Sequence, residues 1–348
     1  MQTIIRKVDE NCIDEMIMKE AGALLKQGAL VAFPTETVYG LGANALDSEA
    51  AAKIYAAKGR PSDNPLIVHI ADMDALPLIT AEIPEAAKKL AAKFWPGPLT
   101  MVMKKSEVVP YGTTGGLDTV AVRMPAHPIA LEMIRHGGGY IAAPSANTSG
   151  RPSPTLASHV ADDMDGIVPL ILDGGAVGIG IESTIVDLTD EIPTILRPGF
   201  ITKEMLQEVV GEVQIDKGLD ADSKTPPKAP GMKYRHYAPK AELMIVEGSS
   251  EAVVEKINAL VKENEEKGIC TGIIGTEETI SRYPAGIVKC MGTRNDELSI
   301  SSHLYGILRE FDESDAKVIY SESFEEGAMG SAIMNRLLKA AGHKIIHV

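Results

Sequence analysis

Two cations at a predicted turn are the residues best suited to chemistry. Lys58-Gly59-Arg60-Pro61 follows a segment of helical composition and precedes Asn64-Pro65, which leads into an apolar run. A guanidinium offers phosphate oxygens a planar fork, and an ammonium offers a mobile point charge. The pair could therefore grip neighbouring phosphates and stabilise a leaving pyrophosphate. A solvated basic turn is the alternative, because Lys and Arg are common on protein surfaces.

Hydroxyl and amide side chains follow a second apolar run. Pro144-Ser145-Ala146-Asn147 comes after Tyr140–Ala143, which has the composition of a buried strand, and Ser153 follows nearby. Open α/β sheets bind ligands outside the carboxyl ends of their strands. These groups could therefore hydrogen-bond to a phosphate or a ribose. An ordinary Asx or Ser turn would explain the same residues without a ligand.

Arg123 and His69 each lie inside a strand-like segment. Arg123 places a charge within the apolar run Val120–Pro125, so it needs a partner or a ligand. Both a substrate carboxylate and a structural ion pair with an Asp or Glu remain open. His69, in Leu66–Ile70, is by default a core or half-buried histidine. Two further polar groups border apolar runs: Glu182-Ser183-Thr184 and Arg197-Pro198-Gly199.

Several common catalytic signatures are absent from the sequence. It has neither a G-x-x-x-x-G-K-[ST] phosphate loop nor a G-x-S-x-G nucleophile elbow. Gly40–Ala45 satisfies G-x-G-x-x-A, but Pro34–Tyr39 separates it from the preceding strand, so we reject a dinucleotide fingerprint. The spacing of His, Cys and carboxylates is not that of a metal site. Phosphate-binding cations without a protein nucleophile indicate transfer between bound substrates, in which positioning and electrostatics dominate.

Composition narrows the class of protein. With 348 residues, 45% of them hydrophobic, the chain is expected to form two domains. Its net charge of -14 disfavours a broad nucleic-acid surface. No apolar run approaches the roughly 20 residues of a membrane span, and the start lacks a signal peptide. We therefore expect a cytoplasmic protein. Cys12, Cys270 and Cys290 form neither a disulfide framework nor a zinc site.

Helical and strand-like segments alternate around these residues. In the first part of the chain the helical segments are Asp14–Lys26, Ser48–Ala57 with Ser48 at its N-cap, Pro84–Phe94 and His127–Arg135. The strand-like segments are Ala29–Phe33, Leu66–Ile70, Leu99–Met103, Thr119–Met124, Leu170–Leu172 and Thr184–Leu188. The alternation resumes after residue 240 with Glu242–Val246, Glu251–Lys262, Thr271–Ile274, His303–Phe311, Ala316–Tyr320 and Met329–Ala341. This pattern predicts an α/β domain followed by a smaller, doubly wound α/β domain.

Residues 211–240 break the alternation and are predicted to be a linker. The segment contains four prolines, and near its end lies the basic and aromatic cluster Lys233–Tyr237. A passive tether would be filled with Gly and Ser instead. Long structureless connections are commonly either disordered or functional.

Six motifs taken together have a recognisable order and spacing over residues 1–210. They are Pro34-Thr-Glu-Thr-Val-Tyr-Gly-Leu41, Lys58-Gly-Arg-Pro61, Trp95-Pro-Gly-Pro-Leu-Thr100, Arg123-Met-Pro125, Pro144-Ser-Ala-Asn147 and Leu196-Arg-Pro-Gly199. In this respect the chain resembles the YrdC-type threonylcarbamoyl-AMP synthases. Pro230–Pro239 and the α/β domain after it resemble the longer, two-domain branch of that family.

The resemblance implies a domain plan. Residues 1–210 would form a YrdC-like catalytic domain, with a twisted mixed sheet and flanking helices. Residues 211–240 would be a linker that folds over the active site and excludes water from the adenylate. Residues 241–348 would form a small Rossmann-like α/β domain.

The resemblance also implies a reaction and its residues. L-threonine, bicarbonate or CO2, and ATP would give L-threonylcarbamoyladenylate and pyrophosphate, for modification of the adenosine next to the anticodon in tRNA. Magnesium would come with the triphosphate, held by phosphate oxygens and water rather than by a protein metal site. Lys58 and Arg60 would be catalytic. ATP would contact Lys58, Arg60, Asn64, Thr119, Ser145, Ser153, Arg197 and Tyr237, and threonine would contact Thr37, His69, Arg123, Ser183 and the backbone of Ala143.

The expected partners are small-molecule substrates and, downstream, the tRNA threonylcarbamoyl-transferase machinery, without stable nucleic-acid binding and without a membrane. Two functions of other classes remain. An RNA-binding module would use Lys58–Arg60 and Lys233–Arg235, which the acidic charge balance disfavours. A carbamoyl transferase containing a YrdC-like domain is disfavoured because the chain lacks the zinc-finger Cys pairs and the acylphosphatase-like segment of those larger proteins.

Overall fold

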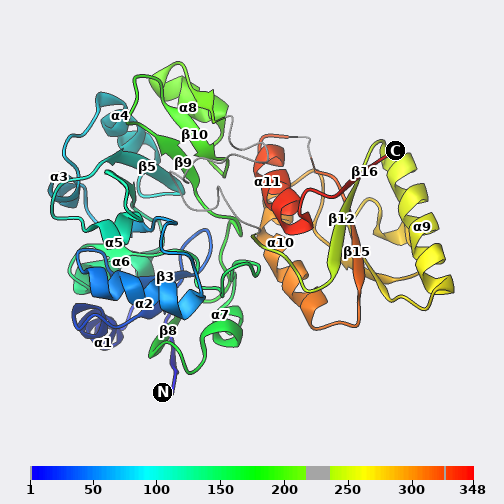
Figure 1. Ribbon diagram of the computed structural model, residues 1–348, viewed down its shortest axis with the longest axis horizontal. Coiled ribbons are helices and arrows are strands. Elements are labelled where there is room, and N and C mark those ends of the chain that lie inside the picture. Colours follow the sequence, from blue (N-terminus) through cyan, green and yellow to red (C-terminus); the bar gives the residue numbers. More distant parts are fainter. Residues whose placement is uncertain (1, 217–235, 325–326) are drawn as a thin grey trace. The chain divides into compact units, whose positions relative to one another are not determined.

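The structure is a computed structural model that describes residues 2–216, 236–324 and 327–348 (Figure 1). The described residues fall into two units. The first comprises residues 2–149, 154–178 and 182–216. The second comprises residues 150–153, 179–181, 236–324 and 327–348. Short pieces of chain near residues 150 and 180 thus belong to the second unit, although the sequence around them belongs to the first.

A mixed sheet forms the centre of the first unit. Its 11 described strands have the order β1-β8-β2-β3-β7-β4-β6-β5-β9-β10-β11. The sheet contains parallel pairs, such as β4 with β6, and antiparallel pairs, such as β5 with β6. The strands are β1 (Ile4–Lys7), β2 (Val31–Phe33), β3 (Gly40–Asn44), β4 (Ile67–His69), β5 (Leu99–Lys104), β6 (Thr119–Arg123), β7 (Ile141–Ala142), β8 (Leu170–Asp173), β9 (Thr184–Asp187), β10 (Thr194–Arg197) and β11 (Gln214–Ile215).

The helices of this unit begin and end at residues with clear local causes. Asp14 accepts a hydrogen bond from Met16 N and caps α1, and Asp47 caps α2 in the same way. The predicted cap at Ser48 is therefore wrong by one residue, because the carboxylate of Asp47 takes that role. The helices are α1 (Glu15–Lys26), α2 (Ser48–Lys58), α3 (Leu76–Ile79), α4 (Glu85–Phe94), α5 (Tyr111–Thr114), α6 (Pro128–His136), α7 (Ala157–Met164) and α8 (Lys203–Val210).

Helices cover both faces of the sheet. Along β2, Val31 and Phe33 pack with residues of α1 and α6, whereas Ala32 packs with residues of α2, α4 and α8. Neighbouring residues of a strand point to opposite faces, so these two core clusters lie on opposite sides of the sheet. A third, smaller cluster shares the face of Phe33 further along the sheet; it consists of Ile67, Val102, Ala121, Ile185 and Leu196.

The second unit contains a fully parallel sheet. Its 5 described strands have the order β14-β13-β15-β12-β16. They are β12 (Glu242–Glu247), β13 (Thr271–Gly275), β14 (Ile287–Cys290), β15 (Val318–Glu322) and β16 (Ile345–His347), connected among others by α9 (Ser250–Glu266), α10 (Glu297–Asp312) and α11 (Gly330–Ala341). The predicted α/β fold class, with a mixed sheet first and a smaller Rossmann-like part second, is confirmed. None of the described helices is both long and apolar enough to cross a membrane.

Candidate active site

Strand register places several predicted site residues in one row across the first sheet. His69 pairs with Arg123, Arg123 pairs with Thr100, and Thr100 pairs with Ile185. Ile185 in turn pairs with Arg197. Paired residues share a face of a sheet, so these side chains lie side by side on the face that carries the small apolar cluster of Ile67, Val102, Ala121, Ile185 and Leu196. Ser183 lies on that face as well, because it stands two residues before Ile185.

Arg123 forms a buried ion pair, which is one of the two alternatives left open by the sequence. Its Nη2 lies 2.7 Å from Oε1 of Glu36, and the side chains of Arg123 and Glu36 are 5% and 16% exposed. Contact at that distance satisfies the charges, although the angles are not those of a hydrogen bond. Arg123 Nε and Glu36 Oε2 are also buried and have no hydrogen-bond partner. The pair therefore retains one donor and one acceptor for other groups.

His69 is a neutral neighbour of that pair. Burial, followed by the positive charge of Arg123, lowers the pKa of His69 to about 3. Its Nδ1 lies 3.1 Å from the carbonyl oxygen of Ile67, and its ring meets Phe33 edge-on. At neutral pH this side chain therefore presents an uncharged ring at the end of β4.

Ser183 and Arg197 are joined at the far end of the row. Arg197 Nε and Nη2 donate to the carbonyl oxygen of Ser183 at 3.1 and 2.9 Å, and Nη2 also reaches its Oγ at 3.2 Å. The Ser183 hydroxyl lies 2.8 Å from Thr100 Oγ1. The buried guanidinium is thus held by the backbone at the start of β9.

Lys58 and Ser145 meet in a second group. Lys58 is the last residue of α2 and is only 2% exposed. Its Nζ donates to the carbonyl oxygen of Ser145 at 2.5 Å and to that of Asn147. Gly59 follows in the left-handed conformation, with φ of 62°, and ends the helix. The helix end and the Ser145–Asn147 loop are therefore fixed to each other through one ammonium group.

The amino ends of β4 and β6 carry three further predicted site residues: Arg60, Asn64 and Thr119. Arg60 donates to the carbonyl oxygens of Asn64 and Pro65 at 3.3 and 3.1 Å. Asn64 is 1% exposed, and its Oδ1 has no hydrogen-bond partner. Since Ile67 pairs with Ala121 in parallel strands, Thr119 lies beside the Asn64–Pro65 end of β4. A strand rises by about 3.3 Å per residue, so Thr119 and Arg123 lie roughly 13 Å apart along β6.

Thr37 lies in the loop between β2 and β3. Thr35 Oγ1 lies 2.9 Å from Thr37 Oγ1 and donates to the carbonyl oxygen of Val38 at 2.7 Å. Both threonines are buried. Ala143 lies on the same face beside Ile67, because its N–H donates to the carbonyl oxygen of Ile67 at 2.8 Å, whereas His69 itself pairs with Ile141. The loop residue between the threonines is Glu36, so its position is set by two anchored neighbours.

Ser153 and Tyr237 belong to the second unit. Ser153 is fully buried there. Tyr237 is 6% exposed, and its ring packs against that of Tyr305 at a tilt of 35°, with ring centroids 5.1 Å apart. Its φ of 65° is uncommon for a residue with a side chain. Three residues of the predicted Lys233–Tyr237 cluster lie outside the described part of the chain: Lys233, Tyr234 and Arg235.

Glu36 is the site residue that sequence reasoning did not single out. Its motif was noted, but nothing in the sequence says that a carboxylate 87 positions before Arg123 is its partner. A signal was present, because an acid between two threonines follows the buried strand β2 directly. Among the described residues, no group of three or more His, Cys, Asp and Glu side chains is placed to hold a metal ion.

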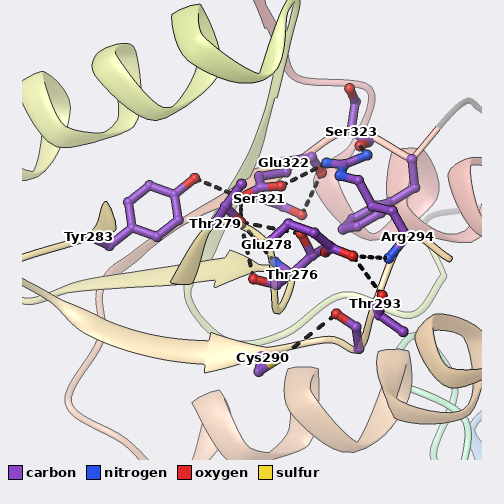
Figure 2. Close-up of polar contacts among 12 residues, drawn as sticks. Thr276, Glu278, Thr279, Tyr283, Cys290, Thr293, Arg294, Ser321, Glu322 and Ser323 are labelled. Carbon is purple, nitrogen blue, oxygen red and sulfur yellow. Dashed lines mark hydrogen bonds and ion pairs between the residues drawn. The ribbon is translucent and has the colours of Figure 1, made fainter. Parts of the chain in front are cut away.

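A second polar cluster lies in the second unit, at the carboxyl ends of β13, β14 and β15 (Figure 2). Glu322 is 1% exposed, and its Oε1 accepts from Tyr283 at 2.7 Å and from Thr279. Its Oε2 lies 2.7 Å from Arg294 Nη2, and Arg294 also donates to the carbonyl oxygen of Ser323. These contacts connect the strand ends to one another.

Comparison with known proteins agrees with both units. The family described as "Telomere recombination", named for Sua5, YciO and YrdC, matches residues 23–199. "Threonylcarbamoyl-AMP synthase, C-terminal domain" matches residues 201–342. The threonylcarbamoyl-AMP synthase of Bacillus subtilis is 51% identical over 97% of this chain and 96% of its own length. That of Pyrococcus abyssi is 51% identical over 99% of this chain and 100% of its own.

A solved structure extends the agreement to three dimensions. The crystal structure of P. abyssi Sua5 complexed with L-threonine covers 99% of this chain and 100% of its own, at 50% identity and a TM-score of 0.95. The resemblance inferred from the motifs, including that to the two-domain branch of the family, is confirmed. The chain therefore belongs to the Sua5 and YrdC family of threonylcarbamoyl-AMP synthases.

Proposed function

We propose that this chain synthesises L-threonylcarbamoyladenylate from L-threonine, bicarbonate or CO2, and ATP, and releases pyrophosphate. The product serves threonylcarbamoyl modification of the adenosine next to the anticodon in tRNA. The observation that supports this assignment best is the buried Arg123–Glu36 pair, whose spare donor and acceptor match the carboxylate and ammonium of an amino acid. Family membership and the threonine complex of the P. abyssi relative point to the same substrate.

Threonine is assigned to the carboxyl ends of β4 and β6. Arg123 would pair with the threonine carboxylate, and His69 would form an uncharged wall beside it. Thr37, Ser183 and the backbone of Ala143 would complete the threonine contacts. A neutral His69 suits this place, because it adds no second cation to compete for the carboxylate.

ATP is assigned to the residues around the amino ends of the same strands. Lys58 and Arg60 would hold the phosphates and stabilise the pyrophosphate that leaves, which makes them the catalytic cations. Asn64, Thr119 and Ser145 would make further contacts there, and Arg197 would contact ATP from the row that contains Arg123. The buried and unpartnered Oδ1 of Asn64 suits a donor from the nucleotide. Magnesium, bound through phosphate oxygens and water, would add positive charge to the triphosphate.

Reaction between the two groups requires no protein nucleophile. The threonine amine would capture CO2, and an oxygen of the resulting carbamate would attack the α-phosphate in line with the leaving pyrophosphate. The small apolar cluster containing Ile67, Ala121 and Val102 lies on the same face of the sheet, between the two groups. An apolar floor lowers the local dielectric and strengthens the charge contacts above it.

The domain plan and the linker belong to the same proposal. We assign catalysis to residues 1–210, a closing function to residues 211–240, and a separate α/β domain to residues 241–348. Tyr237 and Ser153 would contact ATP, and closure of the linker would exclude the water that hydrolyses an adenylate. We further propose a cytoplasmic location and a downstream transferase that carries the threonylcarbamoyl group to tRNA.

Pyrophosphate release tests the proposed function directly. Purified full-length chain is supplied with ATP and Mg²⁺, with L-threonine and bicarbonate added separately or together. We expect pyrophosphate above background only when both are present, since the attacking carbamate needs both. Release that does not depend on threonine would reject the assignment.

A further inference from the structure

The ion pair of Arg123 and Glu36 leaves two buried atoms unsatisfied, and they differ in kind. Arg123 Nε is a donor, and Glu36 Oε2 is an acceptor. Buried polar atoms nearly always have a partner, either from the protein or from a ligand or water. Glu36 is held in position by the Thr35 and Thr37 contacts on either side of it. A fixed donor beside a fixed acceptor is complementary to an amino acid, whose carboxylate accepts hydrogen bonds and whose ammonium donates them.

We propose, as an extension of the function proposed above, that Glu36 is a catalytic residue that accepts a proton from the ammonium group of threonine. The reaction needs such an acceptor. An ammonium nitrogen has no lone pair, so it cannot attack CO2 until a proton has left. Carboxylates are established general bases when they lie within hydrogen-bond reach of the proton. Glu36 is the carboxylate that the structure places against Arg123, the group assigned to the threonine carboxylate.

Carbamate formation consists of a proton transfer followed by formation of an N–C bond. One ammonium proton moves to Glu36 Oε2, which leaves a neutral amine and a protonated Glu36. The nitrogen lone pair then forms the N–C bond to CO2, while a π pair of the CO2 moves onto oxygen. The second N–H proton leaves to solvent, and the product is the carbamate anion. Glu36 releases its own proton to solvent before the next turnover.

Arg123 connects the binding of threonine to the position of this base. Without substrate, the guanidinium Nη2 lies 2.7 Å from Oε1 of Glu36. When the threonine carboxylate binds Arg123, the guanidinium is shared between two carboxylates, and the ammonium group of threonine lies within reach of Glu36. In a buried site an ammonium next to a carboxylate is also driven toward the neutral pair, because both charges are poorly solvated. His69 stays uncharged throughout and adds no competing charge.

The charge of Glu36 also acts on His127, which in turn contacts Glu10. His127 is 9% exposed, its Nδ1 is buried without a hydrogen-bond partner, and its Nε2 lies 3.8 Å from Glu10 Oε2. Burial lowers the pKa of His127, whereas the charges of Glu10 and Glu36 raise it, so the ring interacts with both carboxylates. Glu10 is 52% exposed. His127 is therefore a titratable ring that contacts a solvated carboxylate and lies within the field of Glu36.

Glu36→Gln in the full-length chain tests the proposal, because it keeps the shape and an acceptor oxygen but cannot take the proton. At pH 7 we expect turnover of threonine-dependent pyrophosphate release to fall about 10²- to 10⁴-fold. L-threonine binding, measured by calorimetry without ATP, should weaken far less. The defect relative to wild type should shrink as the pH approaches the pKa of the free amine, because the amine then arrives without its extra proton.

Controls separate this proposal from the assignment of function. Glu82→Gln removes an exposed carboxylate that pairs with Lys104 and should leave turnover unchanged. Glu36→Asp keeps a carboxylate and should retain the wild-type pH profile at lower turnover, even if Glu36→Gln folds poorly. A defect that is constant with pH, or normal turnover of Glu36→Gln, would overturn the role of Glu36 alone. Wild-type protein without threonine-dependent release would reject the proposed function itself.

Discussion

At the scale of single residues, Lys58 connects the helix end to the loop that carries Ser145. Its ammonium is buried and donates to two backbone carbonyl oxygens. Lys58 is therefore a proposed phosphate ligand that also holds the Ser145–Asn147 loop against the end of α2. Removing a preorganised charge from a phosphoryl-transfer site commonly lowers turnover by about 10²- to 10³-fold. Lys58→Ala should show a loss of this size in pyrophosphate release.

A matched lysine on the same helix provides the control. Lys53 donates to the carbonyl oxygen of Gly28, away from the site. Lys53→Ala should keep wild-type turnover, and circular dichroism should show both variants folded. If Lys58→Ala and wild type had equal turnover, Lys58 would not be a phosphate ligand.

His69 makes stability depend on pH. Its pKa is about 3 in the folded chain and about 6.5 in an unfolded one. Between these values the unfolded state binds a proton that the folded state does not, so stability falls as the pH drops below about 6.5. At pH 5 this contribution reaches about 2 kcal/mol at most. Urea unfolding at pH 7 and pH 5 should show a smaller difference for His69→Gln than for wild type. An equal difference would mean that His69 is readily protonated.

At the scale of elements, close packing of α1 on α6 depends on one glycine. A Cβ added at Gly22 would lie 2.4 Å from the backbone oxygen of His136, which cannot move away cheaply. Gly22→Ala should therefore destabilise the chain by about 1–3 kcal/mol through overpacking. Thermal unfolding measures the change.

Gly306, inside α10, is the matched control for that substitution. An added Cβ there meets nothing within 4 Å. Gly306→Ala should stabilise its helix by about 0.5–1 kcal/mol, because alanine restricts the unfolded chain and favours the helix. Loss of stability in both variants to the same extent would show that steric crowding is not what distinguishes Gly22.

Glu322 joins the strand ends of the second unit in the cluster of Figure 2. Glu322→Ala removes the carboxylate that accepts from the Thr279 and Tyr283 hydroxyls and breaks the ion pair with Arg294. We expect a loss of about 1–3 kcal/mol, typical of buried groups that lose their partner. Hydrogen exchange should locate faster opening in β13 and β15 rather than in the first sheet. Unchanged exchange in those strands would contradict this account.

Much of this architecture follows from sequence patterns, and the exceptions have physical causes. The apolar runs around Phe33, His69 and Arg123 form strands as predicted. The strand β3 was not predicted, because Gly40 and Gly42 disfavour extended structure on propensity. Here they are needed, since side chains at these positions would collide with the Phe33 ring and with Ile141. Propensities of single residues do not include contacts with side chains elsewhere in the chain.

At the scale of the whole molecule, the candidate site draws on residues from distant parts of the chain. Motif order identified the residues, but only strand pairing explains why His69, Arg123, Ser183 and Arg197 share one face. The partner of Arg123 could not be read from the sequence, because many carboxylates were available to a chain with 48 Asp and Glu residues.

A truncation tests what the second part of the chain contributes. A chain ending before Lys233 keeps the first unit but loses Tyr237 and everything after it. We expect impaired synthesis, because the proposed ATP contact and the exclusion of water are both lost. Tyr237→Ala in the full-length chain separates the ring from the rest of the deleted part. Full activity of the truncated chain would show that the linker is a passive tether.

The row of paired residues across the first sheet constrains how this chain can change in length. Side chains alternate between the two faces of a strand, so one residue inserted into β6 before Arg123 would turn its guanidinium toward the opposite core. The same holds for β4 and His69. Homologous chains that keep the activity should therefore gain and lose residues in the connections, such as the segment between β4 and β5, while these strands keep their length. In an alignment of such chains, the strands that carry the site would be the segments without gaps.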